Sequence, residues 1–120
     1  ELYMTKEIIK LFKDGKKVVY ERDFEQQPLN IGDFVNAAKL EIAQKKYAIK
    51  TNDNPLEMKP EDGEELVNAD LEFIVSFFHD QFNVEEARQG ISPMTMREDF
   101  ERWLDMSSGL LSQAGNPQKK

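Results

Sequence analysis

The strongest hydrophobic pattern of the chain lies at residues 64–80 and predicts a buried helix. Four of the eight phenylalanines fall between Asp70 and Phe82. With Ile74 they recur at helical separations, which indicates one apolar face. Further apolar side chains make this face too wide for one neighbour to cover, and each buried phenylalanine contributes about 1.5–3 kcal/mol. We therefore interpret this segment as the core helix, with a partner-binding face as the alternative.

Residues 6–21 predict a β-hairpin. Apolar residues dominate the run that ends at Phe12, and a second run begins at Val18. The Asp14-Gly15 pair between them favours a type I′ turn, which needs positive φ at both central positions. Two strands alone are marginal in water. The hairpin must therefore pack on helices or pair with strands of another copy.

Another helix is predicted over residues 31–47. Asn30 suits the N-cap position, because its side-chain oxygen can accept from N–H groups of the first turn. Residues 50–63 then hold two prolines and a glycine among few large apolar side chains, so we expect a mobile loop there. The apolar positions that repeat at helical spacing in the helix are Ile31, Phe34, Val35, Ala38 and Ile42.

Two more helices are predicted after the core helix. Asn83 with Glu86 forms a capping box, and Gly90 ends the short helix that it opens. Ser92-Pro93 opens the last helix, with serine as N-cap and proline at the first helical position. The apolar face of that helix consists of Met96, Phe100, Trp103, Leu104 and Leu111.

These elements predict a single α+β domain over residues 1–111, in which an N-terminal β-hairpin precedes a small bundle of three to four α-helices. A length of 120 residues supports one core rather than two. Residues 1–3 resemble an expression remnant before a natural start at Met4. Residues 112–120 are expected to form a disordered tail.

Composition restricts the classes of function. The net charge of −7 disfavours a nucleic-acid backbone as the main ligand. The absence of cysteine excludes disulfides and thiolate metal sites. No run of about 18 apolar residues exists, so we expect no membrane span. Acidic residues concentrate at 53–72, where Lys59 is the only basic one; this block is either a solvated segment or a region that steers a basic partner.

The sequence does not indicate an enzyme. His79 is the only histidine, and its place near a helix end favours a structural role over a catalytic one. The six glycines are scattered singly, unlike a phosphate-binding loop. Asp53 and Asp62 lack the spacing of a calcium loop. We therefore expect no catalytic residue, metal or cofactor.

Several short segments together resemble one known family. Asp80-Gln81-Phe82 follows the apolar helix, Val84-Glu85-Glu86 opens a short acidic helix, and Gly90-Ile91 ends it. The hairpin sequence at 8–18 is also similar. In these respects the chain resembles the small tail assembly chaperones of long-tailed (siphovirus) bacteriophages and prophages of Gram-positive bacteria. The last helix, from Ser92 onward, departs from the family pattern.

The resemblance implies a non-enzymatic protein of the host cytoplasm that binds the phage tape measure protein and keeps it soluble. It further implies recruitment of the major tail protein, which forms the tail tube, and absence of the chaperone from the finished virion. A structural head–tail connector or tail-completion protein, which stays in the virion, fits the sequence pattern equally well. A DNA-binding regulator is disfavoured, because no basic recognition helix is present. The chain could also form a homo-oligomer.

Capture of a helical tape measure protein would use apolar side chains near the ends of elements. Aromatic side chains carry much of the energy of interfaces, and methionine adapts to varied partners. The candidates are Phe82, Met96, Phe100 and Trp103, with ordinary core packing as the alternative for all four.

The C-terminal residues suggest a second form of the protein. Gln118-Lys119-Lys120 can be encoded by a run of A followed by G, on which ribosomes can slip back by one base. Many genes of the family that the chain resembles make a longer form by such a frameshift. Gly115-Asn116-Pro117 would then be a flexible link to a second module.

Overall fold

The computed structural model describes residues 6–52, 54, 56 and 59–114, with side chains up to residue 109. It confirms the α+β class: an antiparallel hairpin comes first and helices follow. The elements are β1 (Lys6–Lys13), β2 (Lys16–Asp23), α1 (Ile31–Thr51), α2 (Pro60–Phe77), α3 (Val84–Gly90), α4 (Pro93–Glu98) and α5 (Phe100–Ala114).

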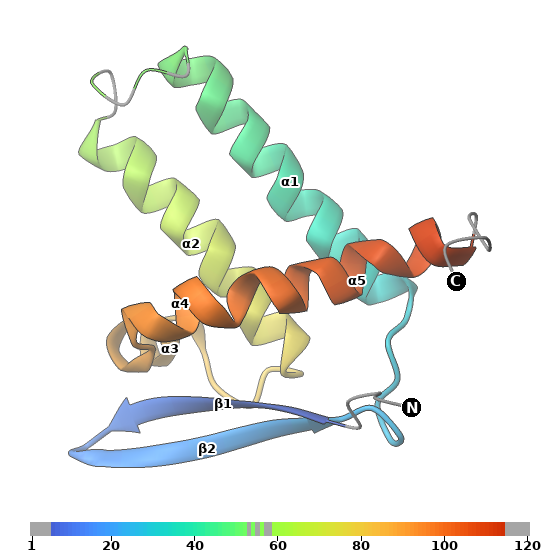
Figure 1. Ribbon diagram of the computed structural model, residues 1–120. Coiled ribbons are helices and arrows are strands. Elements are labelled where there is room, and N and C mark those ends of the chain that lie inside the picture. Colours follow the sequence, from blue (N-terminus) through green and yellow to red (C-terminus); the bar gives the residue numbers. More distant parts are fainter. Residues whose placement is uncertain (1–5, 53, 55, 57–58, 115–120) are drawn as a thin grey trace.

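The hairpin lies along one side of the molecule and the helices cover one of its faces (Figure 1). α1 and α2 run antiparallel and project away from the hairpin as a two-helix arm. α5 crosses both helices near the base of this arm, whereas α3 lies close to the hairpin turn. The uncovered face of the hairpin and the free end of the arm therefore lie on opposite sides of the molecule.

The hairpin has the predicted turn. Asp14 and Gly15 both have positive φ, at 51° and 76°, between the paired residues Lys13 and Lys16. Alternate side chains of β1 face the helices, so Glu7, Ile9 and Leu11 are buried while their neighbours face outward. The hairpin does pack on helices, which was one of the two expected solutions.

α2 is the central element of the core, as predicted. The rings of Phe77 and Trp103 stack with centroids 5.8 Å apart, and Phe78 meets the same indole edge-on at 5.0 Å. Phe73 meets Phe100 edge-on at 6.0 Å. The phenylalanines of α2 therefore hold α5 in place through a continuous aromatic cluster.

The predicted loop at 50–63 is largely wrong at both ends. α1 continues to Thr51, where Asn52 caps it in the left-handed conformation. α2 begins at Pro60 rather than residue 64, because proline at the first helical position and acidic residues in the first turn favour a helix start. Residues 53, 55, 57 and 58, which fall in the expected mobile loop, lie outside the described residues.

The helix caps at Asn30, Asn83 and Ser92 are confirmed, since each side chain accepts from a backbone N–H of the first turn. The last helix, however, is divided at Asp99 into α4 and α5. α5 also continues past Gly109 to Ala114, so a disordered tail beginning at 112 was wrong. Residues 1–3 and 115–120 lie outside the described part. Within the described part, no helix combines the length and apolar character that crossing a membrane requires.

Candidate protein-binding surface

Three of the four predicted partner-binding residues are core residues. Trp103 is 0 % exposed, and Phe82 and Phe100 are also buried. Phe82 packs against Tyr20 of β2, with ring centroids 5.0 Å apart. Met96 is partly buried against the same core. In this conformation the three aromatic side chains contact the interior instead of a partner, because Phe100 and Trp103 pack on phenylalanines of α2 and Phe82 packs on β2.

A buried carboxylate joins the hairpin to α5. Glu7 accepts from both the Nε and an Nη of Arg102, at 3.0 and 2.7 Å. It also accepts from the indole N–H of Trp103 at 3.0 Å. The hydrogen bond to Glu7 is the main reason that the pKa of Arg102 is raised. This cluster is a structural link, since its charges are paired with one another.

A buried guanidinium joins β2 to the start of α1. Arg22 donates to both carboxylate oxygens of Asp33, at 2.8 and 2.9 Å. Its other bonds go to backbone oxygens of Gln27, Pro28 and Phe77, so all five N–H groups of the side chain are used. The Asp33 carboxylate also accepts from the backbone N–H of Asn30 at 2.8 Å. The cap of α1 and the hairpin are thereby fixed together.

An exposed apolar row on α1 is the main unexplained surface. Val35, Ile42 and Ile49 are spaced by seven residues and are 42, 55 and 79 % exposed. The opposite side of α1 faces the interior through Ala37 and Leu40, which are buried. We call Val35, Ile42 and Ile49 the α1 stripe. Val35 and Ile42 were expected on the inner face of this helix, which was wrong, whereas Ile49 lies beyond the predicted end of the helix at residue 47.

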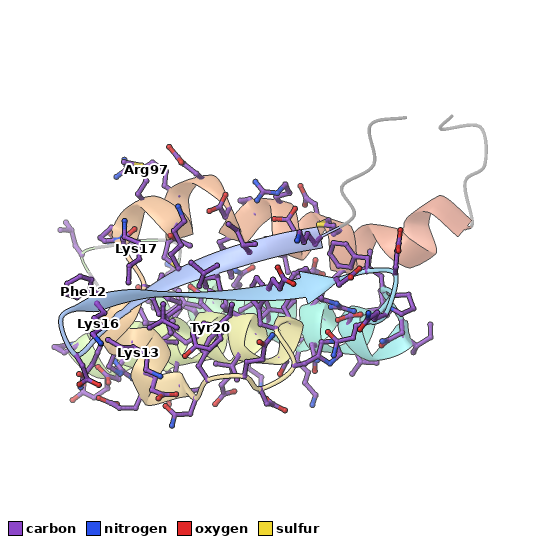
Figure 2. The ribbon with its side chains drawn as sticks, turned by 90° about the horizontal axis from the view of Figure 1, so that it is seen from below. Phe12, Lys13, Lys16, Lys17, Tyr20 and Arg97 are labelled. Atoms are coloured by element: carbon purple, nitrogen blue, oxygen red, sulfur yellow. The ribbon has the colours of Figure 1, made fainter. Side chains whose placement is uncertain are left out.

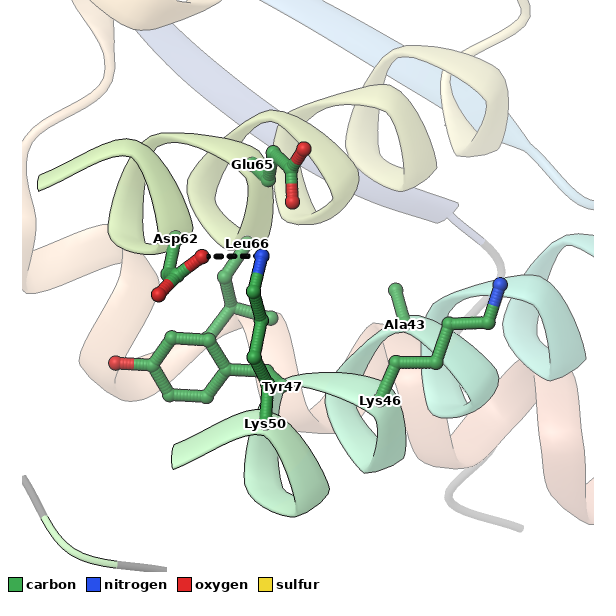
Figure 3. A pocket seen from close by; sticks show the side chains of 7 residues that line it. All are labelled: Ala43, Lys46, Tyr47, Lys50, Asp62, Glu65 and Leu66. Atoms are coloured by element: carbon green, nitrogen blue, oxygen red, sulfur yellow. Dashed lines mark ion pairs between the residues drawn. The ribbon is translucent and has the colours of Figure 1, made fainter. Parts of the chain in front are cut away.

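A small pocket lies between α1 and α2 on the arm (Figure 3). It has a volume of about 230 Å³. Lys50 and Asp62 form an ion pair of 2.7 Å across it. This bond holds the pKa of Asp62 below its usual range and raises the pKa of Lys50. The pocket is lined by Ala43, Lys46, Tyr47, Lys50, Asp62, Glu65 and Leu66.

The lining of the pocket consists of lysine, carboxylate, tyrosine and apolar side chains. The pocket lining contains no histidine, cysteine, serine or threonine, and Lys50 and Asp62 in it are paired with each other. Across the described residues, no group of three or more acidic or histidine side chains is placed to hold a metal ion. Comparisons of the sequence with models of known protein families, with curated proteins and with solved structures found no match.

The outer face of the hairpin is a second exposed surface. Ile8, Phe12 and Val19 point away from the helices, and Phe12 is 59 % exposed. Lysines alternate with them along both strands. This alternation was visible in the sequence, but the sequence could not show which face the helices would cover.

Proposed function

We propose that this chain is a non-enzymatic tail assembly chaperone of long-tailed bacteriophages or prophages, and that the α1 stripe binds helical segments of the tape measure protein. The observation that carries the proposal is the exposed apolar row at Val35, Ile42 and Ile49. The family follows from the resemblance of segments such as Asp80-Gln81-Phe82 to these chaperones. The proposal places the protein in the host cytoplasm.

The geometry of the α1 stripe suits a helical partner. Residues seven apart lie on one line of a helix, about 10.5 Å from one to the next. A partner helix with apolar residues at the same repeat can pack along such a line. β-branched side chains keep few rotamers in a helix, so they lose little freedom on binding. The stripe thus offers a firm apolar ridge rather than an adaptable cavity.

The surroundings of the stripe indicate the character of the partner helix. Lys39, Lys45 and Lys46 are exposed on α1, with Glu41 as the only exposed carboxylate between Val35 and Ile49. A tape measure segment with acidic residues beside its apolar face would therefore be favoured, because charge complementarity accelerates association and excludes wrong partners. Recruitment of the major tail protein around this complex is the second part of the proposal and rests on the resemblance.

The test is co-expression with the tape measure protein encoded in the same gene cluster. The wild-type chain is expected to keep that protein soluble and to co-purify with it. Ile42→Ser, which shortens an exposed side chain of the stripe, should lose both effects while keeping its helical circular dichroism. Glu41→Ser is the matched control, because it alters the neighbouring exposed residue outside the stripe. Soluble capture by an Ile42→Ser/Ile49→Ser double variant at the wild-type level would overturn the proposal.

A further inference from the structure

A groove runs along the two-helix arm between α1 and α2. The pocket of Figure 3 forms its outer part, and a second hollow of about 260 Å³ continues it towards the base of the arm. Ala43 lines both, so the two adjoin. Every lining residue that the structure describes belongs to α1 or α2. We call this hollow, which follows α1 from Asn36 to Lys50, the arm groove; its length is about 21 Å at about 1.5 Å per residue.

The two walls of the arm groove carry opposite charges. Lys39 and Lys46 stand on the α1 wall, seven residues apart, and Glu65 and Glu72 stand on the α2 wall at the same separation. All four are exposed. Because the helices are antiparallel, Lys46 shares the outer pocket with Glu65, and Lys39 shares the second hollow with Glu72. Residues seven apart lie along one line of a helix, so each wall presents a row of a single sign.

The charges of the two rows do not neutralise each other. None of the four makes an ion pair with a described side chain. At the tip of the arm, by contrast, Lys50 crosses the groove to Asp62 at 2.7 Å. That ion pair bridges the outer end, whereas the rows between it and the base remain available to a partner.

The floor of the arm groove is apolar and built partly of small side chains. Ala43 and Ala69 contribute only methyl groups to it, and Leu40 and Phe73, which also line it, are buried. Small side chains on two packed helices leave room for larger side chains of a third. The aliphatic stems of the lysines add apolar area to one wall. The groove therefore suits a ridge of leucine-sized side chains.

We infer that the arm groove binds one amphipathic helix of a partner protein and fixes its direction. The apolar seam of that helix lies on the alanine floor, its acidic flank faces the lysine row and its basic flank faces the glutamate row. Turning the helix end for end exchanges its two flanks, so its acidic side chains would then face Glu65 and Glu72. Walls of equal charge would accept both directions. For the natural occupant the inference rests on the proposed function: it is a further helical segment of the tape measure protein, beside the segment on the α1 stripe.

The cations at the turn of the hairpin provide a contrast and a control. Figure 2 shows Lys16, Lys17 and Arg97 gathered around the turn. Both lysines are exposed and form no ion pair with a described side chain. Charges of one sign attract an acidic partner without selecting its direction. Reversal of these two lysines changes the net charge as much as reversal of the two groove lysines, at a site away from the arm (Figure 1).

A synthetic helical peptide tests the groove. A length of about 18 residues spans it, with a leucine seam, glutamates along one flank, lysines along the other and a lactam bridge on the outer side to hold the helix. The wild-type chain should bind this peptide at least about tenfold more tightly than one of equal composition with both charges mixed on each flank. A nitroxide at the N-terminus of the peptide should broaden amide signals at one end of the groove only, near Ser76 or near Lys50. Exchange of the two flanks should move the broadening to the other end.

Charge reversal in the protein gives a second test. Lys39→Glu/Lys46→Glu and Glu65→Lys/Glu72→Lys should each weaken binding of the peptide at least about tenfold. The chain with all four changes has its walls exchanged, so it should bind the original peptide again, in the opposite direction. Lys16→Glu/Lys17→Glu, matched in charge to the first variant, should leave the affinity within about twofold of the wild type. Circular dichroism confirms that each variant is folded.

Equal broadening at both ends of the groove would overturn the inference, as would binding that survives Glu65→Lys/Glu72→Lys. Peptide binding that weakens as the protein concentration rises would also overturn it, because a second copy of the chain would then occupy the groove. The α1 stripe is tested separately. Ile42→Ser/Ile49→Ser should leave peptide binding unchanged, and Glu65→Lys/Glu72→Lys should still keep the tape measure protein soluble through the stripe. Failure of the groove and failure of the proposed function are therefore distinguishable.

Discussion

The indole N–H of Trp103 donates to the buried carboxylate of Glu7 at 3.0 Å, across 96 positions of the chain. Arg102 binds the same carboxylate through two nitrogens. The carboxylate of one β1 residue thus accepts hydrogen bonds from two consecutive residues of α5. The hairpin is held to the helices by this polar link as well as by apolar packing.

Glu7→Gln should lower the free energy of unfolding by about 1–3 kcal/mol, because it removes the charge from a buried carboxylate that accepts three hydrogen bonds. Urea denaturation followed by circular dichroism measures the difference. Glu21→Gln is the control on the same hairpin: its ion pair with Lys6 is exposed, and the expected change is below about 0.5 kcal/mol. Equal decreases of the free energy of unfolding in the two variants would show that the buried link stabilises the fold no more than the exposed ion pair does.

Gly90→Ala should destabilise the protein by about 1–3 kcal/mol, although alanine is the better helix former. The added Cβ would lie 2.9 and 3.0 Å from the backbone oxygen and nitrogen of Phe12, which cannot move independently of β1. Gly109→Ala is the matched control in α5, where a Cβ meets nothing within 4 Å; it should stabilise by up to about 1 kcal/mol. Thermal unfolding of both variants tests the contrast.

Asp70 should make the protein less stable as the pH rises towards neutral. Burial raises the pKa of its carboxyl from 3.8 to about 6, and its Oδ1 is buried without a hydrogen-bond partner among the described groups. The pKa of this carboxyl is higher in the folded than in the unfolded state. Its stabilising contribution to the free energy of unfolding is therefore fully present below pH 3.8 and is lost as the pH rises through about 6. Asp70→Asn should therefore stabilise the protein by about 1 kcal/mol near neutral pH.

The difference between Asp70→Asn and the wild type should vanish near pH 4, where the carboxyl is protonated. Unfolding in urea at several pH values measures it. All other carboxylates are common to both proteins, so their own contributions cancel in the comparison. A stabilisation by Asp70→Asn that is the same at pH 4 and at neutral pH would contradict the assigned titration.

Purified phage particles offer a test of the proposed class of protein. A chaperone is expected to be missing from the finished particle, whereas a head–tail connector or tail-completion protein is retained. Mass spectrometry should therefore detect the chain in infected or induced cells and not in purified particles. Stoichiometric recovery of the chain from the particles would contradict the proposed chaperone and indicate a structural component of the virion.

We expect the codons of Gln118-Lys119-Lys120 to form a run of A followed by G, with an open −1 frame after it. Sequencing of the gene, followed by detection of a longer product with an antibody against the folded domain, tests this. Interruption of the run by synonymous codons should remove the longer product and leave the shorter one.

Local features of the fold were predictable from the sequence. The turn at Asp14-Gly15 and the caps at Asn30, Asn83 and Ser92 depend on residues only a few positions apart. α2 was recognisable because phenylalanines concentrate in its last two turns and just after its end. Pro60 begins α2 as Pro93 begins α4, but the prolines, glycine and polar residues around Pro60 are also typical of a loop.

The binding surfaces could not be read in the same way. Periodicity showed an apolar face on α1, but not that Ala37 and Leu40 would turn inward and leave Val35 and Ile42 exposed. The covered side of α1 is decided by where α2 and α5 pack on it, and those contacts join segments far apart in the sequence. Similarly, nothing near Glu7 indicates a buried carboxylate, because its partners come from the other end of the chain.

The separation between Glu7 and its partners has a consequence for synthesis. Arg22 and Asp33 are 11 residues apart, so this pair can close while the chain is still on the ribosome. Glu7 must wait for Arg102 and Trp103, and we expect docking of the hairpin onto α5 to be the last step of folding, since contacts between distant residues form late. A product that ends before Arg102 leaves the Glu7 carboxylate without its side-chain partners and exposes Phe77 and Phe78, which pack on the missing indole of Trp103. Prematurely terminated chains should consequently aggregate or be degraded, so the cell accumulates only chains that include α5.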